Sequence, residues 1–166
     1  MIPDQYTLSS VNVFERQFEL LKLELTLIDS AIRSFDEITK NVKQWAIVAW
    51  GGAVGLAFGD QMLRPAIWAT AFLPVAFWLL DASFRRVQRT FIVRNREIAE
   101  FINGGPFMEA AQSGKAFGFP LMRMRKKSGR KTSWFTVMTF WTVAPLYILM
   151  MLASIAIGTL VRMGRI

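Results

Sequence analysis

The chain has 166 residues, of which 53% are hydrophobic and 19% are charged, and its mean hydropathy is +0.32. This composition is too apolar for an ordinary soluble domain of such length and indicates a membrane protein. The sequence contains neither cysteine nor histidine, which excludes disulfides, thiol nucleophiles, imidazole bases and the commonest metal ligand. With no catalytic constellation elsewhere, we expect no enzyme activity, no cofactor and no metal site.

The net charge of +8 is distributed unevenly along the chain. Residues 1–44 carry five Lys or Arg against seven Asp or Glu, whereas residues 85–133 carry twelve against three. Basic segments that flank membrane helices stay on the cytoplasmic side of the membrane. We therefore expect residues 85–133 in the cytoplasm.

The acidic region 1–44 predicts a long amphipathic helix in the cytoplasm. Its apolar residues alternate at spacings of three and four, and Thr39 and Val42 continue this register to more than four heptads, which is typical of a coiled-coil seam. The seam consists of Val11, Phe14, Phe18, Leu21, Leu25, Ile28, Ile32 and Phe35. A second stripe lies on another side of this helix and consists of Val13, Leu20, Leu23, Leu27, Ala31 and Ile38.

We interpret the seam as an oligomerisation surface. The alternative is a helix that folds back on its own chain. No other cytoplasmic segment offers a matching long amphipathic helix, which favours oligomerisation.

Three apolar stretches come close to the roughly 20 residues that cross a bilayer as a helix. They run from about Trp45 to Leu63, from Ala66 to Phe84 and from Trp134 to Val161. The first is marginal because Asp60 interrupts it, and a re-entrant hairpin is the alternative to a full crossing. Pro145 in the third predicts a kink, a tilt or an interfacial start at Trp134. Three crossings place the N-terminus inside and the C-terminus outside.

The expected fold is therefore an all-α membrane protein in one compact unit. Residues 1–44 form the oligomerisation helix, 45–84 a transmembrane hairpin, 85–133 the basic cytoplasmic segment, and 134–166 the third transmembrane helix with a short tail. Residues 85–102 should continue the second membrane helix into the cytoplasm, until Asn103-Gly104-Gly105-Pro106 ends it. We read residues 106–133 as a basic loop.

Gly51, Gly55 and Gly59 are spaced by four on the first membrane segment. Small residues one turn apart form a flat strip that another backbone can approach closely. The strip either packs against the second membrane segment of the same chain, or it forms a contact between subunits or the lining of a pore.

Asp81 lies near the cytoplasmic end of the second membrane segment, and Arg85 follows four residues later. This order and spacing favour an ion pair on a helix. We interpret Asp81 with Arg85, or with Arg89 on another helix, as a structural ion pair. The alternative is an ion or proton site, because ionisable residues at membrane depth are often functional.

A basic run directly precedes the third membrane segment and consists of Arg123, Arg125, Lys126, Lys127, Arg130 and Lys131. Such a run is attracted to anionic lipid or binds a cytoplasmic protein partner. Nucleic acid is a weaker interpretation, because Phe117 and Phe119 are the only nearby aromatic residues that could stack on bases.

The stretch Trp78-Leu79-Leu80-Asp81-Ala82-Ser83-Phe84-Arg85-Arg86-Val87-Gln88-Arg89-Thr90-Phe91 resembles a motif of small bacterial inner-membrane proteins of the RipA type, which are octameric. The resemblance covers these fourteen residues and maps the motif onto Trp78, Leu80, Asp81, Arg89 and Phe91, with Gln88 where the motif has Glu. It implies a ring of about eight identical subunits and supplies no chemistry.

From these features we expect a homo-oligomeric protein of the bacterial inner membrane, most concretely a pore- or channel-forming assembly. By analogy alone, it could serve as a membrane effector of a bacterial defence system. The alternative is a non-conducting scaffold whose basic loop recruits a cytoplasmic partner or anionic lipid.

Overall fold

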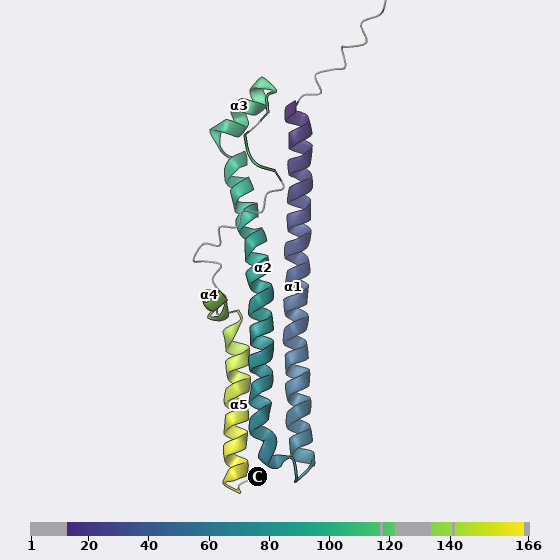
Figure 1. Cartoon of the computed structure of the whole chain (residues 1–166), viewed down its shortest axis with the longest axis vertical. Coiled ribbons are helices and arrows are strands. Elements are labelled where there is room, and N and C mark those ends of the chain that lie inside the picture. Colours follow the sequence, from purple (N-terminus) through teal and green to yellow (C-terminus); the bar gives the residue numbers. More distant parts are fainter. Residues whose placement is uncertain (1–12, 117, 122–133, 141, 165–166) are drawn as a thin grey trace, which may run out of the picture. The chain divides into compact units, whose positions relative to one another are not determined.

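The structure is a computed structural model that describes residues 13–116, 118–121, 134–140 and 142–164 (Figure 1). Most of these residues are helical, and none of them belongs to a β-strand. The predicted all-α fold class is therefore confirmed for the described part of the chain. In chain order the elements are α1 (Val13–Gly59), the 3-10 helix η1 (Arg64–Ala71), α2 (Phe72–Ile102), α3 (Gly105–Ser113), α4 (Trp134–Met138) and α5 (Ala144–Arg162).

Helix α2 confirms that the second apolar segment continues to residue 102. It is preceded by η1, whose first turn contains Pro65, and a second proline, Pro74, is the third residue of α2. Because Pro74 lacks an N–H group, it cannot donate to the carbonyl of Thr70 as an α-helix requires. The Thr70 hydroxyl also donates to the carbonyl of Ile67 at 2.6 Å. These local features favour the tighter 3-10 geometry at the start of the segment.

Helix α3 corrects the interpretation of residues 106–133 as a loop throughout. Gly104 is extended at the N-cap, Pro106 lies in the first turn, and Gly114 ends the helix with a φ of 66°. Proline in the first turn and glycine after the last turn are typical helix boundaries. Phe107 and Ala110 are buried on one face of α3.

The third apolar stretch does not form one long helix. The short helix α4 ends at Met138, and α5 begins only at Ala144. Pro145 lies in the first turn of α5, where a missing N–H group costs no intrahelical hydrogen bond. Of the three alternatives for this stretch, the kink at Pro145 is wrong, because Pro145 lies at a helix start, while a tilt or an interfacial start at Trp134 stays a prediction.

Two helical stretches are long and apolar enough to cross a membrane, namely Arg64–Ile102 and Ala144–Arg162. In each, 28% of the most apolar window is buried, which leaves most of that surface outside the protein core. The expected first span, residues 45–63, includes the last 15 residues of α1 (45–59) and does not meet the same length and composition test.

The chain divides into two compact units rather than the single one expected. Unit 1 comprises Met1–Arg33 and Arg89–Lys127, and unit 2 comprises Ser34–Gln88 and Ser128–Ile166. Helices α1 and α2 each contribute one part to each unit. The boundaries at residues 44 and 84 that the sequence suggested do not coincide with this division.

Unit 1 has an apolar core built mainly on the predicted seam. Leu21 and Ile28 of α1 are buried together with Ile98 of α2 and with Phe107 and Ala110 of α3. Half-buried residues complete this core, among them Phe14, Phe18, Leu25 and Ile32 of the seam and Phe91, Phe101 and Phe119. Phe35, the last seam residue, lies in unit 2, where its ring centroid is 6.4 Å from that of Phe84.

The described seam residues from Phe14 to Ile32 pack within the chain, against residues 89–102 of α2 and against α3. This packing is the alternative of a helix that folds back on its own chain, and oligomerisation through the seam stays a prediction. Val11 lies outside the described residues. The second stripe of α1 is largely exposed instead. The exposed fractions of Val13, Leu20, Leu23 and Leu27 are 42–54%.

Arg94 fixes the segment after α3 within unit 1. Its guanidinium is buried and binds the Glu24 carboxylate at 2.8 Å. It also donates to the carbonyl of Pro120 at 2.6 Å and lies 4.7 Å from the ring centroid of Phe119, which stacks on Phe101. With the contact of Nη1 to Glu97 at 3.4 Å, each of its three nitrogens has a hydrogen-bond acceptor, and a guanidinium with such partners tolerates burial.

The neighbours Leu27 and Ile28 test which face of α1 forms the core of unit 1. Ile28 is 4% exposed and Leu27 is 54% exposed. We expect Ile28→Ala to lower the free energy of unfolding by about 2–4 kcal/mol, because it leaves a cavity. Leu27→Ala should change it by less than about 0.5 kcal/mol. Urea unfolding of the detergent-solubilised protein measures both, and a larger loss for Leu27→Ala would contradict this packing.

Candidate functional site: a buried polar cluster in unit 2

Unit 2 exposes several large apolar side chains and buries several polar ones beside an apolar core of Ala46, Val143, Tyr147 and Met150. Val48, Phe72 and Leu149 are 73%, 75% and 67% exposed, whereas Asp81 and Ser154 are 0% exposed. A soluble domain shows the opposite arrangement. Surfaces that face hydrocarbon can be apolar, while polar groups in a membrane protein face the bundle interior. This arrangement is the strongest structural indication that unit 2 lies in a membrane.

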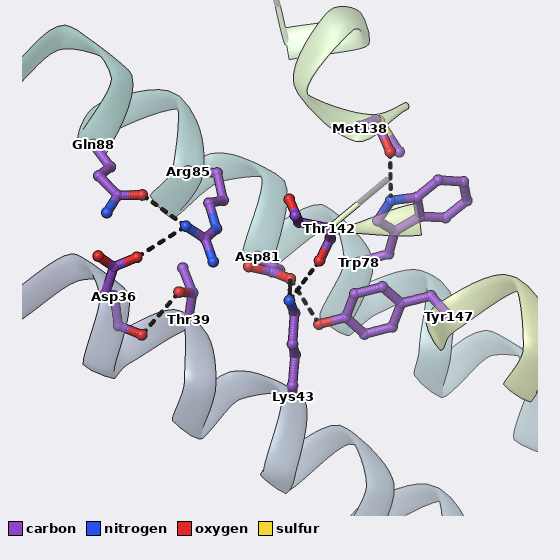
Figure 2. Close-up of polar contacts among 10 residues, drawn as sticks. All are labelled: Asp36, Thr39, Lys43, Trp78, Asp81, Arg85, Gln88, Met138, Thr142 and Tyr147. Atoms are coloured by element: carbon purple, nitrogen blue, oxygen red, sulfur yellow. Dashed lines mark hydrogen bonds and ion pairs between the residues drawn. The ribbon is translucent and has the colours of Figure 1, made fainter. Parts of the chain in front are cut away.

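The buried polar cluster joins α1, α2 and α5 (Figure 2). The Lys43 ammonium of α1 donates to the carbonyl oxygen of Thr142 at 2.6 Å, and its Nζ lies 3.8 Å from Oδ2 of Asp81 on α2. The Tyr147 hydroxyl of α5 donates to the same Oδ2 at 3.2 Å. Three helices thus meet around one carboxylate.

The second oxygen of Asp81 has a different environment. Oδ1 is buried and has no hydrogen-bond partner among the described residues. A buried carboxylate needs an opposite charge and several donors to offset the loss of water. Lys43 supplies the charge and Tyr147 one hydrogen bond, so the stability of this cluster depends on both.

A second polar layer lies one helical turn away along α2. Nη1 of Arg85 is 3.0 Å from Oδ1 of Asp36 on α1 and 2.9 Å from Oε1 of Gln88. The sequence interpretation had paired Asp81 with Arg85 or Arg89. In the structure Asp81 pairs with Lys43, and Arg85 pairs with Asp36. Both partners come from α1, because α1 packs beside α2 and brings these opposite charges close. Arg89 belongs to unit 1.

Sequence reasoning missed Lys43 and Tyr147 as partners of Asp81, and Thr142 as a partner of Lys43. One signal could have found Lys43, since it is the last charge before the first apolar stretch and Asp81 is the first charge at the end of the second. The two arms of a hairpin bring these ends to the same depth. No comparable signal marks Thr142, whose backbone carbonyl is the group used.

Two further contacts hold α5 against the hairpin. Trp50 of α1 donates from Nε1 to the Ser154 hydroxyl at 2.8 Å, and the Thr70 hydroxyl of η1 lies 3.2 Å from the same oxygen. At Gly158, an added Cβ would lie 2.8 Å from the ring of Trp68. Only glycine permits this close approach of η1 to α5.

The glycine strip of α1 has no neighbour in the described chain. A Cβ added at Gly51, Gly52, Gly55 or Gly59 would meet no atom within 4 Å. The strip therefore does not pack against the second membrane segment, and its role as a contact between subunits or as the lining of a pore stays a prediction. The basic run Arg123, Arg125, Lys126, Lys127, Arg130 and Lys131 lies outside the described residues.

No family model, curated protein or solved structure matches the chain. The resemblance around Trp78–Phe91 stays a prediction.

Removing Asp81 tests the cluster directly. Asp81→Ala leaves the partly buried Lys43 charge without its counterion, and we expect the free energy of unfolding in detergent to fall by about 3–5 kcal/mol. Combining Lys43→Met with Asp81→Leu should recover most of this loss, because it replaces the pair with apolar side chains of similar size.

Asp29→Ala is the matched control. Asp29 pairs with Arg33 at 2.7 Å, but its side chain is 57% exposed, so its removal should cost less than about 1 kcal/mol. Equal losses for Asp81→Ala and Asp29→Ala would show that the cluster contributes little to folding.

Proposed function

We propose that this chain is a homo-oligomeric protein of the inner membrane, most concretely a pore- or channel-forming assembly. The observation that carries the proposal is the open glycine strip on the apolar outer surface of unit 2. Helices in lipid gain little from burying apolar surface against one another, because the lipid tails are equally apolar. Close backbone packing at small residues is therefore a main source of helix association in a membrane. Four glycines with free space above them fit the backbone of a second copy.

Large apolar side chains beside the strip support the same interpretation. Val48, which lies on the same face one turn before the strip, and Leu56, which follows Gly55, are 73% and 70% exposed. The strip is therefore part of a larger apolar surface of α1. A contact on this surface contributes shape complementarity without polar groups, as expected inside a bilayer.

We further propose three membrane crossings, with the N-terminus inside and the C-terminus outside. The contacts of Lys43, Asp81 and Tyr147 mark one end of unit 2, and the Trp68–Gly158 contact lies towards the other. The last part of α1 therefore runs beside η1, α2 and α5 through the same apolar layer. The excess of basic residues in 85–133 supports a cytoplasmic position for that segment.

The pore follows from the geometry of repeated contacts. A glycine strip that packs on a different surface of the next subunit generates a ring when the rotation closes. A closed ring of membrane subunits encloses a central space that can conduct ions.

Gly55→Leu tests assembly through the glycine strip. Gly55 is exposed and has no neighbour in the single chain, so the variant should fold and insert normally. We expect it to lose the oligomer in crosslinking and to lose ion flux in liposomes, because the leucine side chain prevents close backbone approach.

Ala69→Leu is the matched control, since it adds the same side chain to an exposed position of η1. It should retain both oligomer size and flux. If Gly55→Leu behaves like Ala69→Leu, the strip faces lipid and the proposed assembly loses its support. Wild-type oligomers without flux would favour a non-conducting scaffold instead.

Reporter fusions test the topology. A reporter that is active only in the cytoplasm should be active after Gly118, and one that is active only outside should be active after Ile166. The charge bias of residues 85–133 is the physical reason for this orientation. The reverse activities would refute the orientation, and cytoplasmic activity at both sites would refute three crossings.

A further inference from the structure

We infer that bilayer thickness controls the self-association of this protein, through the short apolar run at the end of α1. The inference rests on the proposed function, because it concerns the same glycine surface. The apolar run of α1 covers residues 45–59, or about 22 Å of helix at 1.5 Å per residue. Helix α5 has 19 residues, or about 28 Å, while the hydrocarbon core of a typical bilayer is about 30 Å thick.

Both ends of the short run are fixed by contacts. Lys43 cannot extend freely to a more distant headgroup layer, because its ammonium binds the Thr142 carbonyl at 2.6 Å and lies 3.8 Å from Asp81. At the other end, the Asp60 carboxylate accepts the N–H of Met62 at 2.8 Å in the turn that follows α1. Trp45, which is 65% exposed, marks the membrane interface where tryptophan is enriched.

A bilayer of ordinary thickness would therefore cover polar side chains just before Trp45. Asn41 and Gln44 are both exposed. Their amides would lose water without gaining a partner, which is unfavourable. The alternatives for a short membrane helix are local thinning of the bilayer, extension of flanking side chains to the interface, or oligomerisation.

Of these three alternatives, the positions of the Asn41 and Gln44 amides favour oligomerisation. Asn41, Gln44, Val48, Gly51 and Gly55 follow one another at spacings of three and four, so they share one face of α1. A second copy that packs on the glycine strip would cover Asn41 and Gln44 as well. Polar groups of that copy at the same depth then hydrogen-bond to them, as polar side chains do between membrane helices.

In a thick bilayer this contact removes the unfavourable exposure of the amides to hydrocarbon. In a thin bilayer the amides remain in water, and that part of the driving force is absent. Association should therefore increase with bilayer thickness.

The experiment measures association of the full chain in vesicles of three thicknesses. The sequence has no cysteine, so Gln112→Cys on the exposed side of α3 gives a single site for donor and acceptor dyes. The vesicles contain phosphatidylcholine with myristoleoyl, oleoyl or erucoyl chains. Energy transfer between the labelled chains reports the fraction that is associated.

From the thinnest to the thickest bilayer we expect the apparent dissociation constant to fall about tenfold, because mismatch energies accumulate with each added ångström. The lengthened variant Asn41→Leu with Gln44→Leu adds about one apolar turn to α1. It should lose most of the thickness dependence. Ser30→Leu with Ser34→Leu adds the same side chains to exposed positions farther from Trp45 and should retain the dependence.

Three results would overturn the inference, and they can be told apart. Equal association at every thickness would leave the proposed oligomer intact and refute its control by the bilayer. An unchanged dependence in the lengthened variant would show that the dependence does not arise from α1. The absence of association in all three bilayers would refute both this inference and the proposed function.

Discussion

The contact of the Lys43 ammonium with the Thr142 carbonyl and the Asp81 carboxylate is the interaction on which unit 2 depends. It places a charge from each arm of the hairpin in the interior and brings α5 to the same point through Tyr147. Apolar packing alone is non-directional and would allow these helices to slide along or rotate about one another. A buried charge pair allows one register, because any other leaves a charge without its partner. The apolar exterior of unit 2 can vary more freely around this fixed point.

The sequence was informative where a pattern repeats along the chain. The long N-terminal helix, the extension of α2 to Ile102 and the residues of the seam all followed from apolar spacing. The partner of the seam did not follow from this spacing, since periodicity identifies a buried face of a helix but not the segment that covers it. Residues 89–102 include three arginines, and one of these, Arg94, is buried against Glu24 within unit 1. Only the three-dimensional arrangement shows that a basic segment can also supply a core.

The candidate site was predictable in part for a related reason. Asp81 is noticeable because it is an acid in an apolar segment. The sequence predicts a pair with Arg85, the nearest arginine along the helix. Its partners Lys43 and Tyr147 come from positions 38 residues before and 66 residues after it. Such distant pairs depend on how the helices pack. A backbone carbonyl such as that of Thr142 has no sequence signature, so its role could not have been predicted at all.

The 3-10 geometry of η1 changes how residue number relates to distance in the hairpin. A 3-10 helix rises about 2.0 Å per residue against about 1.5 Å in an α-helix. The eight residues of Arg64–Ala71 therefore cover about 16 Å, where α-helical residues would cover about 12 Å. The return arm thus rises farther per residue than α1. Two arms of equal residue number would end at different levels, and insertions or deletions in η1 would displace Asp81 farther than the same changes in α1 would displace Lys43.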